Sequence, residues 1–382
     1  MQRVTGLDGV RGCAILWVLL YHFFALVPKA PWVAAIPLVG PLADFGWIGV
    51  NLFFALSGYL IIPLLAAQRD DPNYYRRFWC RRAFRLVPVY LLCLISYGVA
   101  VALWPDASPD RQRLLDPAIP LWTYWALVQN VWMSARNYMG GEWLRVTWSL
   151  AVEVQFYALI AVMVRMMPRP RLVPMLAVLT AAVVLFRYAV VFLNPGSAAP
   201  IVLLLPCRLD AFLLGGLAAL LPGPVPGGEG RRRLLAWIAL AGSVAAFGWF
   251  AHGGFGGATR LVLPLYYLML SVGCAAVLDL SVRSAAPVRW LMQNAVMVRA
   301  GQLSYFVYLF HLPVLWTVYQ LGSGGAPSLA QGRGVGLMLV VLGVLYGLAE
   351  LSYRWLEAPL IERSHGYFRR VGRVEGARAD SR

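Results

Sequence analysis

The strongest constraint on this chain is a series of apolar segments, each about 20 residues long, that recurs along almost the whole sequence. An α-helix of about 20 apolar residues crosses the hydrocarbon core of a bilayer, and it pairs its backbone polar groups internally, as that medium requires. Hydrophobic residues make up 60% of the 382 and charged residues only 13%, against about 25% charged residues in soluble domains. We therefore predict an all-α polytopic membrane protein with about ten transmembrane helices around a central polar cavity. The predicted spans are 9–27, 45–67, 86–104, 147–166, 172–193, 201–221, 234–251, 261–280, 303–321 and 334–356.

The basic residues predict how these helices are oriented. The chain carries a net charge of +16, but its arginines gather in short clusters in alternate loops. That pattern is typical of cytoplasmic loops facing anionic lipid and does not favour nucleic-acid binding. We therefore predict that both termini are cytoplasmic and that Arg11 lies near the cytoplasmic face. Residues 1–362 are predicted to form one transmembrane domain, followed by a basic cytoplasmic tail at 363–382.

Other sequence features exclude some classes of site. Five cysteines are scattered along the chain without a close pair, so we expect no metal site and no disulfide framework. No basic leader precedes the first apolar run, and we expect a retained span rather than a cleaved signal peptide. The stretch 121–133 in the loop 105–146 is too short to span, and we expect an interfacial or re-entrant helix.

The first predicted span carries two groups that hydrocarbon normally excludes, Arg11 and His22. They are 11 residues apart, which is close to three helical turns, so both side chains lie on nearly the same face of the helix. The helix rise separates them by roughly 16 Å along the axis. A cation and a titratable imidazole on one face predict a polar path from the cytoplasmic surface toward the middle of the membrane. The alternative is that Arg11 extends to the lipid headgroups and His22 only packs.

Polar side chains also recur inside the other predicted spans. Arg82 and Arg85 share one helix face, where paired guanidinium groups suit phosphate, although lipid headgroups are an alternative ligand. Gly58 is expected to allow close helix packing. Packing is the alternative role for each of the other polar residues taken alone. Ser149 and Glu153 share one helix face, and Ser304, Tyr308 and His311 form one polar stripe. Arg208 and Asp210 are two residues apart, so each needs a partner elsewhere. The remaining residues of this group are Asn51, Ser57 and Tyr59.

Taken in order, these motifs resemble the integral-membrane acyltransferase family 3, the O-acetyltransferases of bacterial surface and extracellular glycans and of some macrolides. The resemblance covers nearly the whole chain, although Tyr59 stands where phenylalanine is commoner in the family. Many members also carry a C-terminal extracytoplasmic hydrolase-like domain, which we do not expect here. The motifs that carry the resemblance are LDGVRG followed by His22, VNLFFALSGYLI, RRAFRLVPVY, TWSLAVEVQFY, RLDAFLLGG and LSYFVYLFHLP.

The resemblance implies a multi-pass protein of the bacterial cytoplasmic (inner) membrane, with donor and acceptor on opposite sides. Acyl-CoA, by family default acetyl-CoA, would be a donor substrate held through its phosphates, and no bound cofactor is implied. His22 would be the general base for a hydroxyl of an extracytoplasmic or lipid-linked glycan, or would itself be acylated. The implied phosphate-binding residues are Arg11, Arg82 and Arg85. The further implied site residues are Glu153 and His311 as catalytic groups, and Asn51, Ser57, Tyr59, Trp148, Ser149, Arg208, Asp210 and Tyr308 along the cavity.

A transporter of glycans or lipid-linked sugars, without acyl transfer, is the alternative function. It would share the ten spans and the charges inside the membrane, but it gives no reason for a cytoplasmic arginine pair set against a deep histidine. The sequence also shows no internal repeat, which many transporters have. A membrane sensor or scaffold with a degenerate site is a third class, and the joint presence of Arg11, His22, Arg82, Arg85 and Glu153 argues against it.

Overall fold

The computed structural model describes residues 5–36, 39–104, 110–194, 196–221, 228–253, 259–283 and 286–364. Regular structure within these ranges is helical and includes no strand, so the predicted all-α fold is confirmed. Of the predicted tail at 363–382, only Arg363 and Ser364 belong to the described residues. The long helices are α1 (Thr5–Leu20), α4 (Ile48–Ala67), α5 (Tyr74–Leu103), α9 (Thr147–Met166), α10 (Arg169–Leu193), α12 (Leu205–Leu220), α13 (Glu229–Gly253), α14 (Thr259–Arg283), α16 (Ala295–Ser323) and α17 (Gly332–Ser352).

Each of the ten predicted spans corresponds to one of these long helices. Eight helical segments in the described ranges are long and apolar enough to cross a membrane. The two that are not among them, α13 and α16, have 25 and 29 residues, which exceeds the length that a hydrocarbon core requires. The shorter elements are η1 (Tyr21–Ala25), α2 (Pro31–Ala34), α3 (Val39–Asp44), α6 (Arg111–Leu115), α7 (Leu121–Trp125), α8 (Gln129–Arg136), α11 (Ala199–Leu203), α15 (Ala286–Gln293) and η2 (Tyr353–Glu357).

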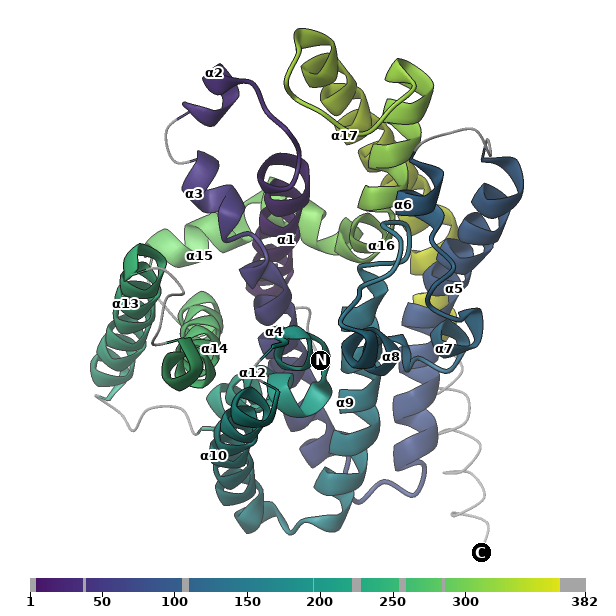
Figure 1. Cartoon of the computed structure of the whole chain (residues 1–382). Coiled ribbons are helices and arrows are strands. Elements are labelled where there is room, and N and C mark those ends of the chain that lie inside the picture. Colours follow the sequence, from purple (N-terminus) through teal and green to yellow (C-terminus); the bar gives the residue numbers. More distant parts are fainter. Residues whose placement is uncertain are drawn as a thin grey trace, which may run out of the picture.

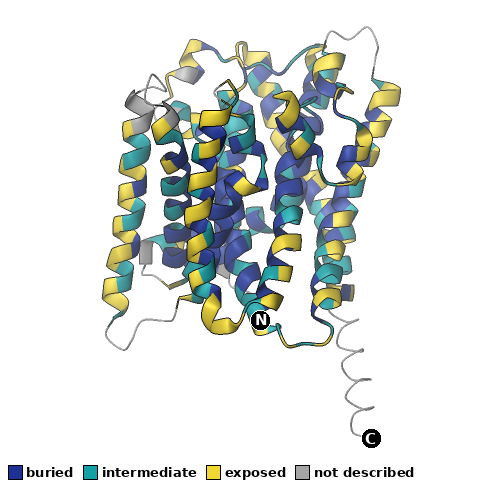
Figure 2. Ribbon diagram, turned by 60° about the horizontal axis from the view of Figure 1, so that its bottom comes forward, coloured by how far each residue is buried: buried dark blue, intermediate teal, exposed yellow. Residues whose placement is uncertain are grey.

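The outer faces of the bundle are apolar. Figure 2 shows the helices side by side, with buried residues toward the middle and exposed residues along the outside. Leu193 on α10 is 79% exposed and Leu185 is 70% exposed. A surface of this kind is unfavourable in water but suits contact with lipid chains.

Two helix pairs at the centre of the bundle are held together by close backbone contact. A Cβ atom on Gly58 of α4 would lie 1.8 Å from the carbonyl oxygen of Phe212 on α12. One on Gly301 of α16 would lie 1.8 Å from the carbonyl oxygen of Asp8 on α1. Small residues permit such an approach between membrane helices, so the predicted packing role of Gly58 is confirmed. Figure 1 shows α1, α4, α9, α12 and α16 gathered around this centre, with α13 and α15 at one side.

The stretch 121–133 differs from the single short helix that we predicted. It forms two helices, α7 and the start of α8, separated at Leu127, whose φ of 55° is in the left-handed region. A non-glycine residue in that region interrupts helical hydrogen bonding. The exposed side chains of Trp122 and Trp125 fit a location at a membrane interface, where tryptophan is enriched.

Candidate active site: two cavities on either side of paired histidines

The three arginines predicted to bind phosphate line one cavity, which we call the arginine chamber. It lies between α1, α4, α5, α9 and α16, and it has an inner part of about 90 Å³ and a wider mouth of about 520 Å³. Arg11, Arg82 and Arg85 belong to the walls of both parts. Leu7 and Glu362 line the mouth, so the two ends of the described chain flank the same opening.

Two of the three arginines in the chamber wall are not held in ion pairs with described residues, although carboxyl groups also line the chamber. Arg11 forms an ion pair with Asp8 at 2.9 Å, and the guanidinium of Arg82 lies over the ring of Tyr157 at 5.9 Å. Within the described part of the chain, neither Arg82 nor Arg85 forms an ion pair. Half-buried guanidinium groups without a carboxylate partner provide donors and charge for an anion such as phosphate.

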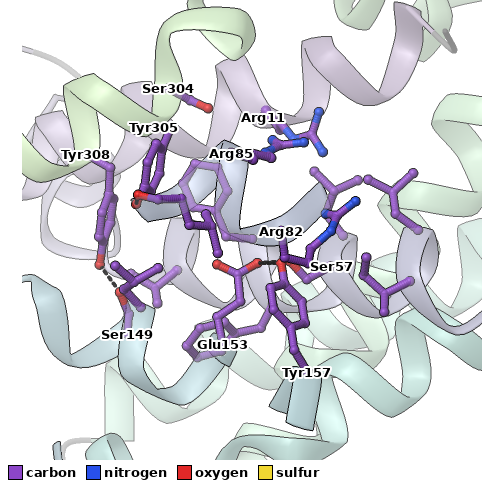
Figure 3. A pocket seen from close by; sticks show the side chains of 18 residues that line it. Arg11, Ser57, Arg82, Arg85, Ser149, Glu153, Tyr157, Ser304, Tyr305 and Tyr308 are labelled. Carbon is purple, nitrogen blue, oxygen red and sulfur yellow. Dashed lines mark hydrogen bonds between the residues drawn. The ribbon is translucent and has the colours of Figure 1, made fainter. Parts of the chain in front are cut away.

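The inner end of the arginine chamber carries hydroxyl and carboxyl groups, shown in Figure 3. Glu153 accepts hydrogen bonds from the hydroxyls of Ser57 and Tyr157, the latter at 2.5 Å. The hydroxyls of Ser149 and Tyr308 hydrogen bond to each other at 2.6 Å. Figure 3 places this hydroxyl pair across the cavity from the three arginines. The interior of the chamber therefore combines hydroxyl groups with the carboxyl group of Glu153.

His22 lines a second cavity of about 70 Å³, which we call the histidine pocket. Its walls include Arg113 and Glu142 from the loop region between α5 and α9, and Trp316 from α16. Both α1 and α16 run from the mouth of the arginine chamber to this pocket, since Leu7 and Gly301 line the chamber mouth. The two cavities therefore open toward opposite ends of the same helices.

The histidine rings lie between the two cavities. Tyr308, at the inner end of the arginine chamber, has its ring centroid 6.1 Å from that of His311. The His311 ring is in turn 4.7 Å from the His22 ring, in an edge-to-face arrangement. His311 is fully buried and lines none of the three cavity regions found among the described residues. Three rings in succession thus connect the arginine chamber with the histidine pocket.

Backbone carbonyl groups fix the hydrogen positions on both imidazoles. Nδ1 of His22 lies 3.0 Å from the Val18 oxygen, and Nδ1 of His311 lies 2.8 Å from the Tyr308 oxygen. A carbonyl oxygen only accepts hydrogen bonds, so each Nδ1 carries the hydrogen and the neutral ring has its lone pair on Nε2. Among the described residues, Nε2 of His311 has no hydrogen-bond partner. Both rings therefore have the form that accepts a proton at Nε2.

Arg11 and His22 do not share one cavity wall, in contrast to the predicted continuous path along one helix face. The helix is regular from Thr5 to Leu20, and His22 belongs to the π-helix Tyr21–Ala25 that follows. The rings of Tyr308 and His311, both from α16, lie between the cavity at Arg11 and the cavity at His22. Arg11 faces the arginine chamber and His22 faces the histidine pocket.

The structure places Glu153 in the wall of the arginine chamber. It shares the arginine chamber with Ser57, Ser149 and Tyr308, which were predicted cavity residues, but it faces the arginine side. Glu153 is thus grouped with the predicted donor-binding residues, away from His22.

Three residues predicted to line the cavity form a buried polar network instead. Arg208 donates a hydrogen bond to the side-chain oxygen of Asn51, and Asp210 pairs with Arg187 at 2.5 Å. All four side chains are at most 3% exposed, and none of them lines the three cavity regions of the described chain. The expectation that Arg208 and Asp210 need partners on other helices is confirmed, since Asn51 is on α4 and Arg187 on α10.

Two further predicted residues, Tyr59 and Trp148, are also absent from the walls of those cavity regions. Tyr59 is 9% exposed and packs with apolar residues of α1, α4 and α14. Trp148 is 8% exposed and lies edge-to-face against Phe54. Both therefore contribute to the packing that supports the arginine chamber.

Several cavity residues were missed by the sequence reasoning. Tyr157 lies four residues after Glu153, a spacing that puts the two on one helix face, so this signal was available. Glu357 lines the chamber mouth and accepts a hydrogen bond from Ser352 at 3.0 Å. Trp316 follows His311 by five residues within an apolar run. Nothing in the sequence pattern distinguishes it from a core residue.

Comparisons with known proteins identify the family and several relatives of this chain. A model of the family described as "Acyltransferase domain" matches residues 4–349. The chain is 24% identical to the O-acetyltransferase OatA of Staphylococcus aureus (strain NCTC 8325 / PS 47), over 98% of this chain and 60% of the relative. It is 29% identical to a Komagataeibacter xylinus protein named "Putative membrane-bound transacylase BcsY", over 96% of this chain and 87% of the relative.

The curated Staphylococcus aureus relatives are longer proteins. The chain spans 57% of the length of one from strain COL, at 24% identity. No solved structure matches the chain. The family model nevertheless covers most of the sequence, from the first span to the last. The chain therefore belongs to the acyltransferase domain family that the ordered motifs resemble.

Proposed function

We propose that this protein transfers an acetyl group from cytoplasmic acetyl-CoA to a hydroxyl of an extracytoplasmic or lipid-linked glycan, in a bacterial inner membrane. One observation carries the proposal, namely two cavities at opposite ends of α1 and α16 that approach each other at the rings of Tyr308, His311 and His22. Such an arrangement suits a reaction whose two substrates come from opposite sides of a membrane. A transport pathway would not require its two sides to have such different chemistry.

The arginine chamber has the character of a donor site. Acetyl-CoA carries phosphates at one end and the thioester at the other, joined by a long flexible arm. Arg11, Arg82 and Arg85 would bind the phosphates at the mouth through charge-assisted hydrogen bonds. The thioester would reach the hydroxyl pair of Ser149 and Tyr308 at the inner end, where a hydroxyl donor suits the developing negative charge on the carbonyl oxygen.

The histidine pocket would bind the acceptor and hold its hydroxyl group next to His22. In the proposed step, the thioester extends past Tyr308 and meets the acceptor hydroxyl between the two cavities, which requires the His311 ring to turn aside. Nε2 of His22 accepts the hydroxyl proton while the hydroxyl oxygen forms a bond to the thioester carbonyl carbon. The carbon–sulfur bond then breaks, and the CoA thiolate takes up the proton from the imidazolium. The products are the O-acetyl ester and CoA thiol. Nδ1 keeps its hydrogen bond to the Val18 carbonyl throughout, which holds the ring in one orientation.

A deletion strain complemented with variants tests this function. We expect wild type to restore an acetyl mass on one sugar of the surface or secreted glycans, measured by mass spectrometry, and His22→Ala to abolish it at unchanged protein abundance. Tyr21→Phe, next to His22 on the same π-turn, serves as the matched control and should restore acetylation. Full acetylation by His22→Ala would refute the assigned base. Loss of the glycan itself from the surface on deletion, without any change in acetylation, would instead support a transporter.

A further inference from the structure

The histidine pocket contains polar groups that the proposed reaction has not used. We infer that Arg113, Glu142 and Trp316 form a binding subsite for one sugar ring of the acceptor, next to His22. This inference rests on the proposed function and adds to it the location and chemistry of the acceptor site.

Arg113 and Glu142 provide complementary hydrogen-bonding groups in the pocket wall. The Arg113 guanidinium lies over the Trp316 ring at 5.2 Å, and the Glu142 carboxylate is 13% exposed and paired with Arg145 at 2.6 Å. The backbone N–H of Glu142 also donates to the Arg113 carbonyl oxygen at 3.1 Å. A guanidinium only donates and a carboxylate only accepts. Together they match neighbouring sugar hydroxyls, which do both.

The remaining walls suit the less polar face of a sugar ring. Trp316 is 4% exposed, and Leu312 and Leu315 beside it are at most 3% exposed, so this side of the pocket is rigid and apolar. The rim at Pro28 is tied to the loop before α17, because the Leu329 N–H donates to the Pro28 carbonyl oxygen at 2.6 Å. An apolar surface with a few fixed polar groups is the usual composition of a small-molecule site.

The histidine pocket offers fewer guanidinium groups than the arginine chamber. Its wall contains Arg113, whereas three arginines line the chamber. A ligand with several phosphates, such as CoA, would find fewer charge-assisted hydrogen bonds in the pocket. Hydroxyl groups need only the mixed donors and acceptors that Arg113 and Glu142 provide. These observations favour a hydroxyl-rich ligand with its reacting oxygen toward His22.

Acetyl transfer by the full chain in proteoliposomes tests the subsite. The donor is radiolabelled acetyl-CoA, and the acceptor probe is a series of oligosaccharides released from the envelope polysaccharide of the source cells. We expect Arg113→Gln and Glu142→Gln each to raise the half-saturating oligosaccharide concentration about tenfold or more, because each removes a hydrogen bond to a charged group. The half-saturating acetyl-CoA concentration should stay at the wild-type value.

Arg136→Gln is the matched control, because Arg136 also lies over a tryptophan, Trp132 at 5.5 Å, but belongs to the walls of neither the arginine chamber nor the histidine pocket. An unchanged half-saturating oligosaccharide concentration in both pocket variants would overturn the inference. So would a change in acetyl-CoA saturation alone, or label transferred only to a non-carbohydrate hydroxyl compound. If wild type transfers no label to any acceptor, the proposed function itself fails, which distinguishes the two outcomes.

Discussion

Replacing Arg82 by glutamine should weaken the binding of the acetyl-CoA phosphates and leave the chemistry at the thioester unaffected. Arg82 is half-buried in the wall of the arginine chamber. It forms no ion pair with a carboxylate of the described residues, so the substitution breaks no ion pair there. A hydrogen bond to a charged group contributes about 1.5–3 kcal/mol, and each 1.4 kcal/mol is a factor of ten in affinity. We expect the half-saturating acetyl-CoA concentration to rise about ten- to hundredfold.

The assay measures release of CoA thiol by the purified protein in proteoliposomes, with acetyl-CoA varied at a fixed acceptor concentration. A second donor, S-acetyl-N-acetylcysteamine, has the same thioester but no phosphates. Arg82→Gln should not alter turnover of this short donor, because the missing interaction was with phosphate. Higher ionic strength should weaken acetyl-CoA binding more in wild type than in the variant, since salt screens the charge that the variant lacks.

Arg81→Gln provides the control for this experiment. Arg81 is the neighbouring residue on α5, and the substitution removes the same charge, but Arg81 does not line the arginine chamber. It should leave the half-saturating acetyl-CoA concentration within about twofold of wild type. The reasoning is refuted if Arg81→Gln and Arg82→Gln have the same effect. It is also refuted if Arg82→Gln slows the short donor as much as acetyl-CoA.

Three further predictions concern packing, buried charge and the second histidine. Gly58→Ala should lower the melting temperature in detergent, because its Cβ would meet a backbone oxygen and overpacking costs about 1–3 kcal/mol. Gly343→Ala, with open space at its Cβ, should leave that temperature unchanged or raise it. Arg187→Leu should destabilise the protein by about 3–5 kcal/mol by leaving the buried Asp210 carboxylate without its ion-pair partner. Adding Asp210→Leu should restore part of that stability, and no recovery would contradict this explanation. His311→Gln should lower kcat about a hundredfold at unchanged protein abundance, and wild-type kcat would exclude His311 from the reaction.

The fold was largely predictable from the sequence because the bilayer imposes one simple requirement on every span. Each run of about 20 apolar residues had to be a helix, and all ten runs correspond to long helices. The need of Arg208 and Asp210 for partners was also predictable, since buried charges require them. The identity of those partners was not, because Asn51 and Arg187 are on other helices and only the packed bundle brings them close to Arg208 and Asp210.

The site was predicted in its residue types but not in its division into two cavities. The spacing of Arg11 and His22 predicts a shared helix face, but it does not predict what lies between them. The rings of Tyr308 and His311, which separate the two cavities, come from α16, far away in sequence. The cavity that Glu153 faces was not predictable either. One of the hydroxyls that donate to its carboxylate belongs to Ser57 on α4, and only the packed bundle brings the two side chains together.

The ion pair between α10 and α12 has a consequence for how the protein is made. Arg187 and Asp210 would each place a lone charge in the membrane if their helices were inserted separately, at a cost of about 2.5–3.5 kcal/mol per charge at the helix centre. If the two helices are inserted together, the charges of Arg187 and Asp210 neutralise each other, because their side chains form an ion pair at 2.5 Å. We therefore expect α10 to remain at the insertion machinery until α12 has been synthesised, so that both helices pass into lipid as one antiparallel hairpin.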